Sequence, residues 1–443
     1  MSDVTGAATA HATAIFLEGV SAVHPAALMH KNVQPVPGGI QIAGTFFPLA
    51  PGAKIGIIGA GKAVAAMAQA LENILSDYPL YGLVITKYDH TLPLQHIEII
   101  AAAHPVPDAQ GVAATRRLLH LADNRAPQDL LLFLLSGGAS ALLADYPEGS
   151  SLEEVQRLFE LLLKSGADIH EMNTVRKHVS GIKGGQLAKK IYPATLCTLI
   201  LSDVPGNDPH VIGSGPTVPD PSTFADTLTI LERYALVPQI PPALLEHLRK
   251  GLAGAIPETP KPGDPHFSHT HNYLTGTNTL SLEAAAHKAR QLGYHTEILT
   301  DTATGDAATL GRQLAQQAID WQGPTPACLL IGGESTVQVT GTGLGGRNQQ
   351  LALAAGPLLQ AYPHITLLSG GTDGTDGPTD AAGAVVNAAI MQQATALHLD
   401  AQAYLRNNDA YHFFEAAGGL LKTGPTQTNV MDIVVVIIEA VSF

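Results

Sequence analysis

The chain has 443 residues, with 24 Lys and Arg against 38 Asp and Glu, which gives a formal net charge of −14. At roughly 150 residues per domain, this length predicts two or three domains. The 44 Gly and 30 Pro are too few for a disordered low-complexity chain. The acidic balance argues against electrostatic binding to nucleic acid or to an anionic membrane, and it leaves open a small anionic ligand held by a local cluster of cations.

The cysteines and the N-terminal segment predict the compartment. Cys197 and Cys328 lie in apolar runs typical of buried strands, and neither has a basic neighbour in sequence that would activate it. Two isolated thiols do not make a disulfide framework, so we expect a reducing, cytoplasmic location. Asp3 stands where a secretory signal would be basic, Glu18 interrupts the apolar stretch that follows, and the run 130–144 is too short to span a bilayer.

The first half of the chain alternates short apolar runs with Ala- and Leu-rich segments, a pattern that predicts an α/β domain. Because the apolar runs are continuous, we expect parallel strands that are buried on both faces. The predicted strands lie at 54–59, 82–86, 97–102, 129–135 and 195–202. The predicted helices lie at 62–75, 109–122, 152–165 and 174–191.

A Pro-rich stretch at 252–270 predicts a linker or surface excursion, after which the alternation resumes. The later predicted strands lie at 273–275, 295–299, 327–331, 336–340, 365–369 and 432–438. The later predicted helices lie at 280–292, 307–319, 348–359, 388–396 and 410–417. The chain is therefore predicted to form two α/β domains, at 1–255 and 256–443.

The first glycine-rich turn joins a predicted strand to a predicted helix and contains Gly59, Gly61 and Lys62. It fails as a P-loop because Ala63 stands where a Ser or Thr should hold Mg²⁺. It fails as a dinucleotide fingerprint because Val64 replaces the third glycine. A lysine beside a helix N-terminus still suits an anion, although a surface lysine on a structural turn is the plainer interpretation.

Two further segments could contact a small acid. Ser136 and Gly137 follow a predicted strand, where small residues and hydroxyl groups allow a ligand to approach the backbone. Asn173, Arg176 and Lys177 are spaced to share a side of one helix with Ser180, which concentrates cations in an acidic chain. A plain tight turn and a solvated basic helix face are the respective alternatives.

The last two glycine-rich segments lie in the second half. Gly345 and Gly346 place Arg347 and Asn348 at a predicted helix start, which repeats the logic of the Lys62 turn. A second loop sets Asp373 and Asp376 among glycines and threonines, where carboxylates can hold Mg²⁺ or accept a proton. A bland Asp/Gly turn is the alternative for that loop. Cations at glycine turns together with an acidic glycine loop are the groups that phosphoryl transfer requires.

The motifs at these segments resemble those of the class II glycerate 2-kinases, whose C-terminal part is called the MOFRL domain. They occur in family order: IGAGKA (58–63), HPVPD (104–108), LLSGGASALL (134–143), EMNTVRKHVSGIKGGQLA (171–188), SDVPGNDPHVIGSGPTVPDPST (202–223), GGESTVQVTGTGLGGRNQQLALA (332–354) and SGGTDGTDGPTDAAGAVV (369–386). Ser335 and Asn207 are mild departures from residues common in the family.

The resemblance implies an N-terminal, Rossmann-like three-layer domain with a mainly parallel sheet, a MOFRL-type α/β domain, and an active site in the cleft between them. It implies phosphorylation of D-glycerate at the 2-hydroxyl by ATP and Mg²⁺, with Lys62 and Arg347 at the phosphates. Asp203 and Asp373 are the candidate catalytic acids, and Asp373 and Asp376 are the candidate metal ligands. We expect a monomer or a homodimer that has neither a nucleic acid nor a membrane as partner.

Two other functions compete with this interpretation. The first is reduction of hydroxypyruvate with NAD(P)H, which requires the third glycine and an acidic residue after the second strand, where the chain has Lys87. The second is a non-catalytic sugar-acid-binding protein, which would not need the acidic glycine loop.

Overall fold

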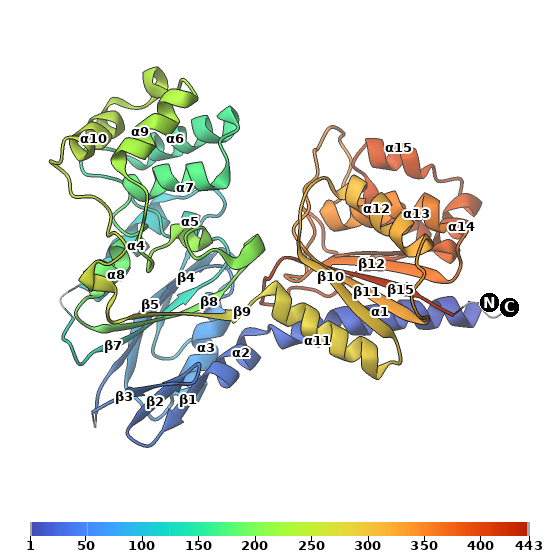
Figure 1. Cartoon of the computed structure of the whole chain (residues 1–443), viewed down its shortest axis with the longest axis horizontal. Helices are drawn as coiled ribbons and strands as arrows, with labels where there is room; N and C mark the ends of the chain where they lie inside the picture. Colours follow the sequence, from blue (N-terminus) through green and yellow to red (C-terminus); the bar gives the residue numbers. More distant parts are fainter. Residues whose placement is uncertain (1, 51, 124, 441–443) are drawn as a thin grey trace. The chain divides into compact units, whose positions relative to one another are not determined.

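The computed structural model describes residues 2–50, 52–123 and 125–440, and it contains two compact units (Figure 1). The central unit comprises Leu28–Thr275. The terminal unit comprises Met1–Ala27 together with Gly276–Phe443. This division differs from the predicted boundary at 255/256, because the first helix α1 (Ser2–Ala22) buries Ala12, Ile15 and Phe16 in the core of the terminal unit.

The central unit is built on a six-stranded sheet in the order β6-β5-β4-β7-β8-β9. Pairing is parallel from β6 through to β8, as the continuous apolar runs predict. The strands are β4 (Ile55–Ala60), β5 (Leu80–Lys87), β6 (Glu98–Ala102), β7 (Leu130–Leu135), β8 (Thr195–Leu201) and β9 (Thr270–Gly276). Every residue of β4 and β7 is buried, so these strands form the centre of the sheet.

Helices and a small second sheet complete the central unit. α3 (Val64–Ile74), α4 (Ala109–Ala122), α5 (Ala139–Leu142) and α8 (Gln186–Ile191) accompany the parallel strands. A separate helical group with its own apolar core, drawn in green in Figure 1, consists of α6 (Leu152–Ser165), α7 (Ile169–His178), α9 (Phe224–Arg233) and α10 (Pro242–Leu252). The antiparallel strands are β1 (Val33–Val36), β2 (Gly39–Ile42) and β3 (Thr45–Pro48), preceded by α2 (Pro25–Asn32). Four short 3₁₀ turns are η1 (Pro205–Asn207), η2 (Ile212–Ser214), η3 (Val237–Gln239) and η4 (Pro265–Phe267).

The terminal unit contains a six-stranded sheet in the order β10-β11-β15-β12-β13-β14. Only its β10–β11 pair is parallel, and the other four pairs are antiparallel. The strands are β10 (His295–Ala303), β11 (Ala327–Gly333), β12 (Ile365–Gly371), β13 (Gly383–Asn387), β14 (Leu420–Leu421) and β15 (Asp432–Ile438).

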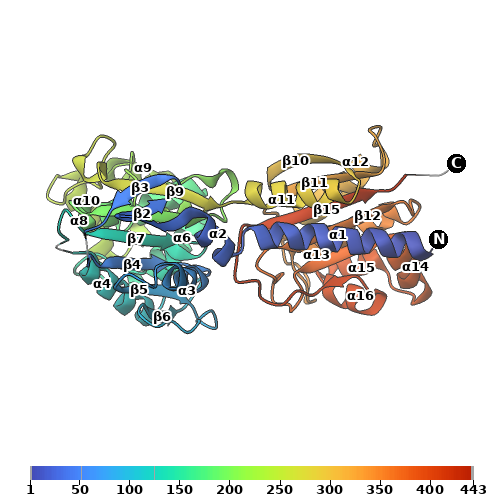
Figure 2. The ribbon, with the colours of Figure 1, turned by 90° about the horizontal axis from the view of Figure 1, so that it is seen from below.

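Helices cover both faces of the terminal sheet, and successive residues of β15 belong alternately to the two cores. Ile433, Val435 and Ile437 pack with residues of α1 and α11 (Asn278–Gln291), whereas Val434 and Val436 belong to the opposite core. Figure 2 shows α1 and α11 side by side along one face of this sheet. The helices on that opposite face are α12 (Ala307–Ile319), α13 (Arg347–Leu359), α14 (Ala388–Ala396), α15 (Ala401–Arg406) and α16 (Ala410–Ala417).

Two predicted elements differ from the structure. The single helix predicted at 174–191 is divided into α7 and α8 by residues 179–185, of which Gly184 and Gly185 adopt left-handed conformations with φ of 57° and 82°. The strand predicted at 336–340 is reduced to an isolated bridge between Thr336 and Asp306. The other predicted strands of the first half are all present, within a few residues of their predicted ends.

The Pro-rich stretch is part of the central unit and does not link the two units. The amide of Asp220 donates to the carbonyl of Pro260 at 2.8 Å, and the hydroxyl of Thr259 donates to the Asp220 carboxylate at 2.9 Å. Further along, the Leu196 amide at the start of β8 donates to the carbonyl of His269. The Pro-rich stretch (252–270), called the strap below, is therefore hydrogen-bonded to the surface of the central unit.

No single helix in the described ranges is long and apolar enough to cross a membrane, although the bent pair Gly6–Ala22 and Pro25–Asn32 meets the length and composition criteria together. The two cysteines are buried and unpaired, and burial raises the pKa of both thiols.

Candidate functional site

The first two predicted glycine turns lie against each other at the carboxyl ends of β4 and β7. The Ser136 amide donates to the carbonyl of Ala60, and the Lys62 amide donates to the carbonyl of Gly137 at 2.9 Å. Gly61 has a φ of +143°, and a Cβ on it would lie 2.1 Å from Ser136 Oγ. Only glycine allows this approach, so the local sequences of both turns position one shared site.

Lys62 supplies a free positive charge at this edge of the sheet. It follows Gly61 directly and precedes α3, so its backbone lies beside the N-terminal end of that helix. Its side chain is half-buried, and within the described part of the chain it has neither a hydrogen bond nor an ion pair. A half-buried ammonium group with no carboxylate partner is suited to an anionic ligand.

Asp203 lies on the other side of the same turn. It follows β8, and a Cβ on Gly137 would lie 1.9 Å from its carboxylate oxygen Oδ2. The absence of a side chain at Gly137 therefore lets the Asp203 carboxylate rest directly against the backbone. The structure brings together Lys62, Ser136, Gly137 and Asp203, which the sequence had assigned separately.

His104 borders the same turn and was not among the predicted site residues. A Cβ on Gly138 would lie 2.9 Å from His104 Cδ2 and 3.5 Å from Lys62 Cγ. Burial, together with the charges of Lys62, Lys87 and His90, lowers the pKa of His104 to about 4. The sequence carries one signal for it, since His104 follows β6 in the way that Lys62 follows β4.

Asn173 of α7 contributes an amide to the neighbourhood of α5. Its Oδ1 accepts a hydrogen bond from Ser214 Oγ at 2.8 Å, and Ser214 in turn lies 2.9 Å from Ser140 Oγ. Its Nδ2 is buried without a hydrogen-bond partner among the described residues. Arg176 Nη1 approaches the same Oδ1 at 3.4 Å, and its guanidinium lies 5.1 Å from the centre of the Phe159 ring.

Lys177 has a different role from the one its spacing predicts. Its Nζ lies 3.2 Å from Asp220 Oδ1, and both side chains are almost completely buried. Burial alone would raise the pKa of Asp220, but Lys177 and Ser222 hold that pKa below its usual value. Asp220 therefore neutralises the charge of Lys177 within the central unit.

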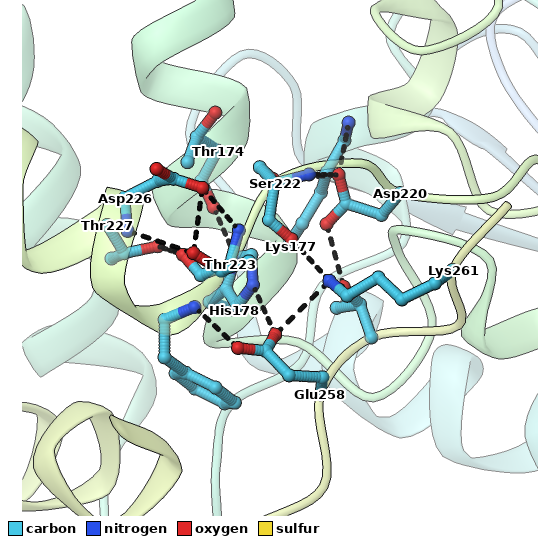
Figure 3. A network of polar contacts seen from close by, with 12 residues as sticks. Thr174, Lys177, His178, Asp220, Ser222, Thr223, Asp226, Thr227, Glu258 and Lys261 are labelled. Carbon is cyan, nitrogen blue, oxygen red and sulfur yellow. Dashed lines mark hydrogen bonds and ion pairs between the residues drawn. The ribbon is translucent and has the colours of Figure 1, made fainter.

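The Lys177–Asp220 pair belongs to a polar network that fastens the Pro-rich strap (Figure 3). Glu258 on the strap accepts from the Phe224 amide at 2.9 Å and lies 3.2 Å from His178 Nε2. Lys261 reaches the same carboxylate at 3.2 Å. A cavity of about 470 Å³ lies beside this network, and its lining includes His178, His247, Arg116 and Lys189 but neither Lys62 nor Asp203.

In the terminal unit, Arg347 begins α13 as predicted, and two carboxylates hold its guanidinium. Nε and Nη2 bind the two oxygens of Asp432 at 2.6 and 2.9 Å, and Nη1 lies 3.0 Å from Glu334 Oε1. Burial would lower the pKa of Arg347, but these carboxylates hold it above its usual range. Asp432 is separated from Arg347 by most of the predicted domain, and no local pattern in the sequence identified it.

Asp376 caps the helix that Arg347 begins. Its carboxylate accepts hydrogen bonds from the amides of Asn348 and Gln349 at 3.1 and 2.8 Å. Gly346 at the N-cap position has no side chain to do so, and a Cβ there would lie 2.3 Å from Asp376. Burial raises the pKa of Asp376 to about 7.

The two predicted metal ligands have different partners in the structure. Asp376 is 2% exposed and faces the backbone of α13, whereas Asp373 is half-buried and accepts from the amide and hydroxyl of Thr375. Within the described ranges, no three His, Cys, Asp or Glu side chains lie close enough together to hold a metal ion.

Comparison with known proteins gives two family matches. The sequence model described as "Domain of unknown function (DUF4147)" matches residues 11–249, and that of the MOFRL family matches residues 327–432.

Several curated relatives resemble the chain over most of its length. A D-glycerate 2-kinase of Thermotoga maritima is 42% identical, over 86% of this chain and 89% of the relative. A glycerate 2-kinase of Pyrococcus horikoshii is 40% identical, over 87% and 88%. A relative of Agrobacterium vitis, 41% identical over 88% and 89%, carries the provisional name hydroxypyruvate reductase. The crystal structure of a Thermotoga maritima glycerate kinase is 38% identical with a TM-score of 0.86, and the match covers 98% of this chain and 100% of that one.

Proposed function

The chain belongs to the glycerate 2-kinase family with a MOFRL domain, and we propose that it transfers the terminal phosphoryl group of ATP to the 2-hydroxyl of D-glycerate. The products are 2-phosphoglycerate and ADP. The observation that carries this proposal is the partner-free Lys62 ammonium, which shares one glycine turn with the Asp203 carboxylate.

Lys62 is assigned to the phosphates. Negative charge on the transferred phosphoryl group is spread over its oxygens in the transition state, and a fixed cation in a half-buried site stabilises that charge. The glycines Gly59 and Gly61 keep the backbone open around it, because side chains there would collide with Leu134 and Ser136.

Asp203 is assigned to the acceptor hydroxyl. The 2-hydroxyl oxygen attacks the terminal phosphorus, an O–P bond forms, and the P–O bond to ADP breaks. The proton of the hydroxyl passes to the Asp203 carboxylate, which also orients the attacking oxygen. Support comes from the close approach of the Asp203 carboxylate to Gly137, because the next residue, Gly138, lies beside the Lys62 side chain.

The carboxylate of glycerate is assigned to Asn173 and Arg176, with Ser136 and Gly137 alongside. The unpartnered Asn173 Nδ2 can donate to an acid oxygen, and Arg176 offers a planar fork of donors. Lys177 is left out of this assignment because Asp220 neutralises it.

Arg347, together with Gly345, Gly346 and Asn348, is assigned to the nucleotide. Asp432 fixes the Nε edge of the guanidinium, so a phosphate oxygen would compete with Glu334, whose side chain is 41% exposed, for Nη1. This places a pre-oriented arginine at the start of α13.

Mg²⁺ fits as a partner of the nucleotide and not as an ion in a protein cage. Mg²⁺ usually keeps several waters and binds one or two carboxylates together with substrate phosphates. Asp373 offers one such carboxylate, whereas Asp376 is taken up by α13. When bound, Mg²⁺ would offset the charge of the phosphates.

The competing reductase function lacks support at the turn itself. Val64 occupies the third glycine position of the dinucleotide fingerprint and is completely buried as the first residue of α3. We also propose a cytoplasmic location, supported by the two unpaired buried thiols.

The proposal is tested with the purified full-length protein. D-glycerate should cause release of ADP from Mg·ATP, whereas hydroxypyruvate should cause no oxidation of NADH or NADPH. Lys62→Met should lower kcat/KM by roughly 10²- to 10³-fold without a change in Tm, because the lysine stabilises charge and makes no polar contact that holds the fold. Lys54→Met, at the exposed amino end of the same strand, is the matched control. Full activity of Lys62→Met, or glycerate-independent release of ADP, would refute the assignment.

A further inference from the structure

Three side chains with no carboxylate partner leave neighbouring strands at one edge of the central sheet. Lys62 follows β4, Lys87 ends β5, and His104 follows β6. Lys87 is in register with Ala102, two residues before His104, and the Gly61 amide donates to the carbonyl of Ile85 in β5. The topology therefore delivers all three residues to adjacent positions.

The surroundings of His104 show that the three side chains act on one another. The charges that shift its protonation are those of Lys62, Lys87 and His90, and all of them oppose a positive imidazole. A Cβ on Gly138 would contact both the His104 ring and Lys62 Cγ, so these two side chains lie close to the same glycine. Neutral imidazole can donate one hydrogen bond and accept another.

None of the three side chains has a hydrogen bond or an ion pair in the described part of the chain. Asp108, on the loop that follows β6 and contains His104, accepts from the Gly111 amide of α4 at 2.8 Å and from the Tyr88 hydroxyl at 2.7 Å. In a chain with a net charge of −14, two lysines without counter-ions beside a half-buried imidazole are a local reversal of charge.

We propose that Lys87 and His104 bind, together with Lys62, a phosphate group at the carboxyl ends of β4, β5 and β6. This inference rests on the proposed function in that it adds two binding residues to the same site. The phosphate could belong to the nucleotide or to 2-phosphoglycerate, since both ligands present the same oxygens. Lys87 would contribute charge, and His104 would contribute a hydrogen bond from a neutral ring.

The test measures ligand binding by the full-length protein in calorimetry, with ADP and 2-phosphoglycerate as separate probes in the presence of Mg²⁺. The variants are Lys87→Gln and His104→Gln, and the control is Lys54→Gln, which removes an exposed lysine from the opposite end of β4. We expect Lys87→Gln to raise Kd roughly tenfold for at least one probe. A loss with ADP alone assigns the phosphate to the nucleotide, and a loss with 2-phosphoglycerate alone assigns it to the product.

Equal Kd values for Lys87→Gln and Lys54→Gln with both probes would overturn the proposal. Should His104→Gln lower Tm, Lys87→Gln decides alone, because the Lys87 side chain makes no polar contact whose loss could unfold the unit. Failure of the proposed function is a separate result: it would be a wild-type protein that binds both probes and does not phosphorylate glycerate.

Discussion

The surroundings of each cation, more than its position in a motif, decide what it can do. Lys62 has no partner and can meet a ligand, whereas Lys177 is neutralised in a buried pair with Asp220. Arg347 lies between these cases, because Asp432 orients it and Glu334 occupies its remaining edge. A charged side chain that is paired within the fold contributes to the structure, and its charge is not available to a ligand.

The pKa of His104 gives a direct test of the charge cluster. Burial and three neighbouring cations lower it from 6.5 to about 4, so the ring should be neutral at pH 5–8. NMR titration should show one imidazole resonance that is constant until the pH approaches 4 and that is absent from His104→Gln. Because the unfolded state binds the proton more readily between these two values, stability should fall as pH falls through that window. A midpoint near 6.5 would contradict the arrangement.

The sequence predicted only those candidate residues that a local motif contains. Glycine turns predicted Lys62, Ser136 and Arg347 as candidates, because close approach of the backbone needs glycine wherever it occurs. The partner of Arg347 is Asp432, on a strand that the sequence places far away, so no spacing rule could find it. His104 could have been found, since it follows a predicted strand at the same edge.

At the scale of single elements, α13 depends on an acid outside the helix. Asp376→Ala should remove the acceptor of two helix N–H groups and lower the free energy of unfolding by about 1–2 kcal/mol. Asp320→Ala, an exposed residue just after α12, is the control and should have little effect. Denaturant unfolding measures the difference, and the Mg²⁺ concentration for half-maximal activity should stay unchanged in Asp376→Ala. Equal stability of the two variants would mean that the cap contributes nothing.

The Pro-rich strap (252–270) depends on a buried ion pair. Asp220→Ala leaves the Lys177 ammonium buried without its partner, so the free energy of unfolding should fall by about 3–5 kcal/mol. Asp226→Ala removes an exposed carboxylate that accepts from the amide and hydroxyl of Thr223 and should cost below about 1 kcal/mol. Should the two variants unfold at the same denaturant concentration, the network of Figure 3 would not hold the strap.

Strands that are buried along their whole length were predicted correctly, whereas segments whose structure depends on contacts distant in sequence were not. β4 and β7 are buried along their whole length, and their apolar runs predicted them. Helical periodicity continued through residues 179–185, but Gly184 and Gly185 end that continuity with positive φ values. The proline content of the strap resembles that of a linker because contacts such as Thr259 to Asp220 are invisible in a local window.

At the scale of the whole molecule, the chain crosses between its units twice, after Ala27 and after Thr275. The sequence predicted a single crossing, because nothing in α1 indicates which core its apolar residues will join. Lys62 lies in the central unit and Arg347 lies in the terminal unit. We therefore expect neither unit alone to be active.

Transfer of the phosphoryl group to the 2-hydroxyl of glycerate is tested by identification of the product. The full-length protein is incubated with D-glycerate and Mg·ATP, and the product is passed to enolase without a phosphoglycerate mutase. We predict immediate formation of phosphoenolpyruvate, because only 2-phosphoglycerate is a substrate for that step. A signal that appears only after the mutase is added would show transfer to the 3-hydroxyl, and no signal in either case would contradict the account.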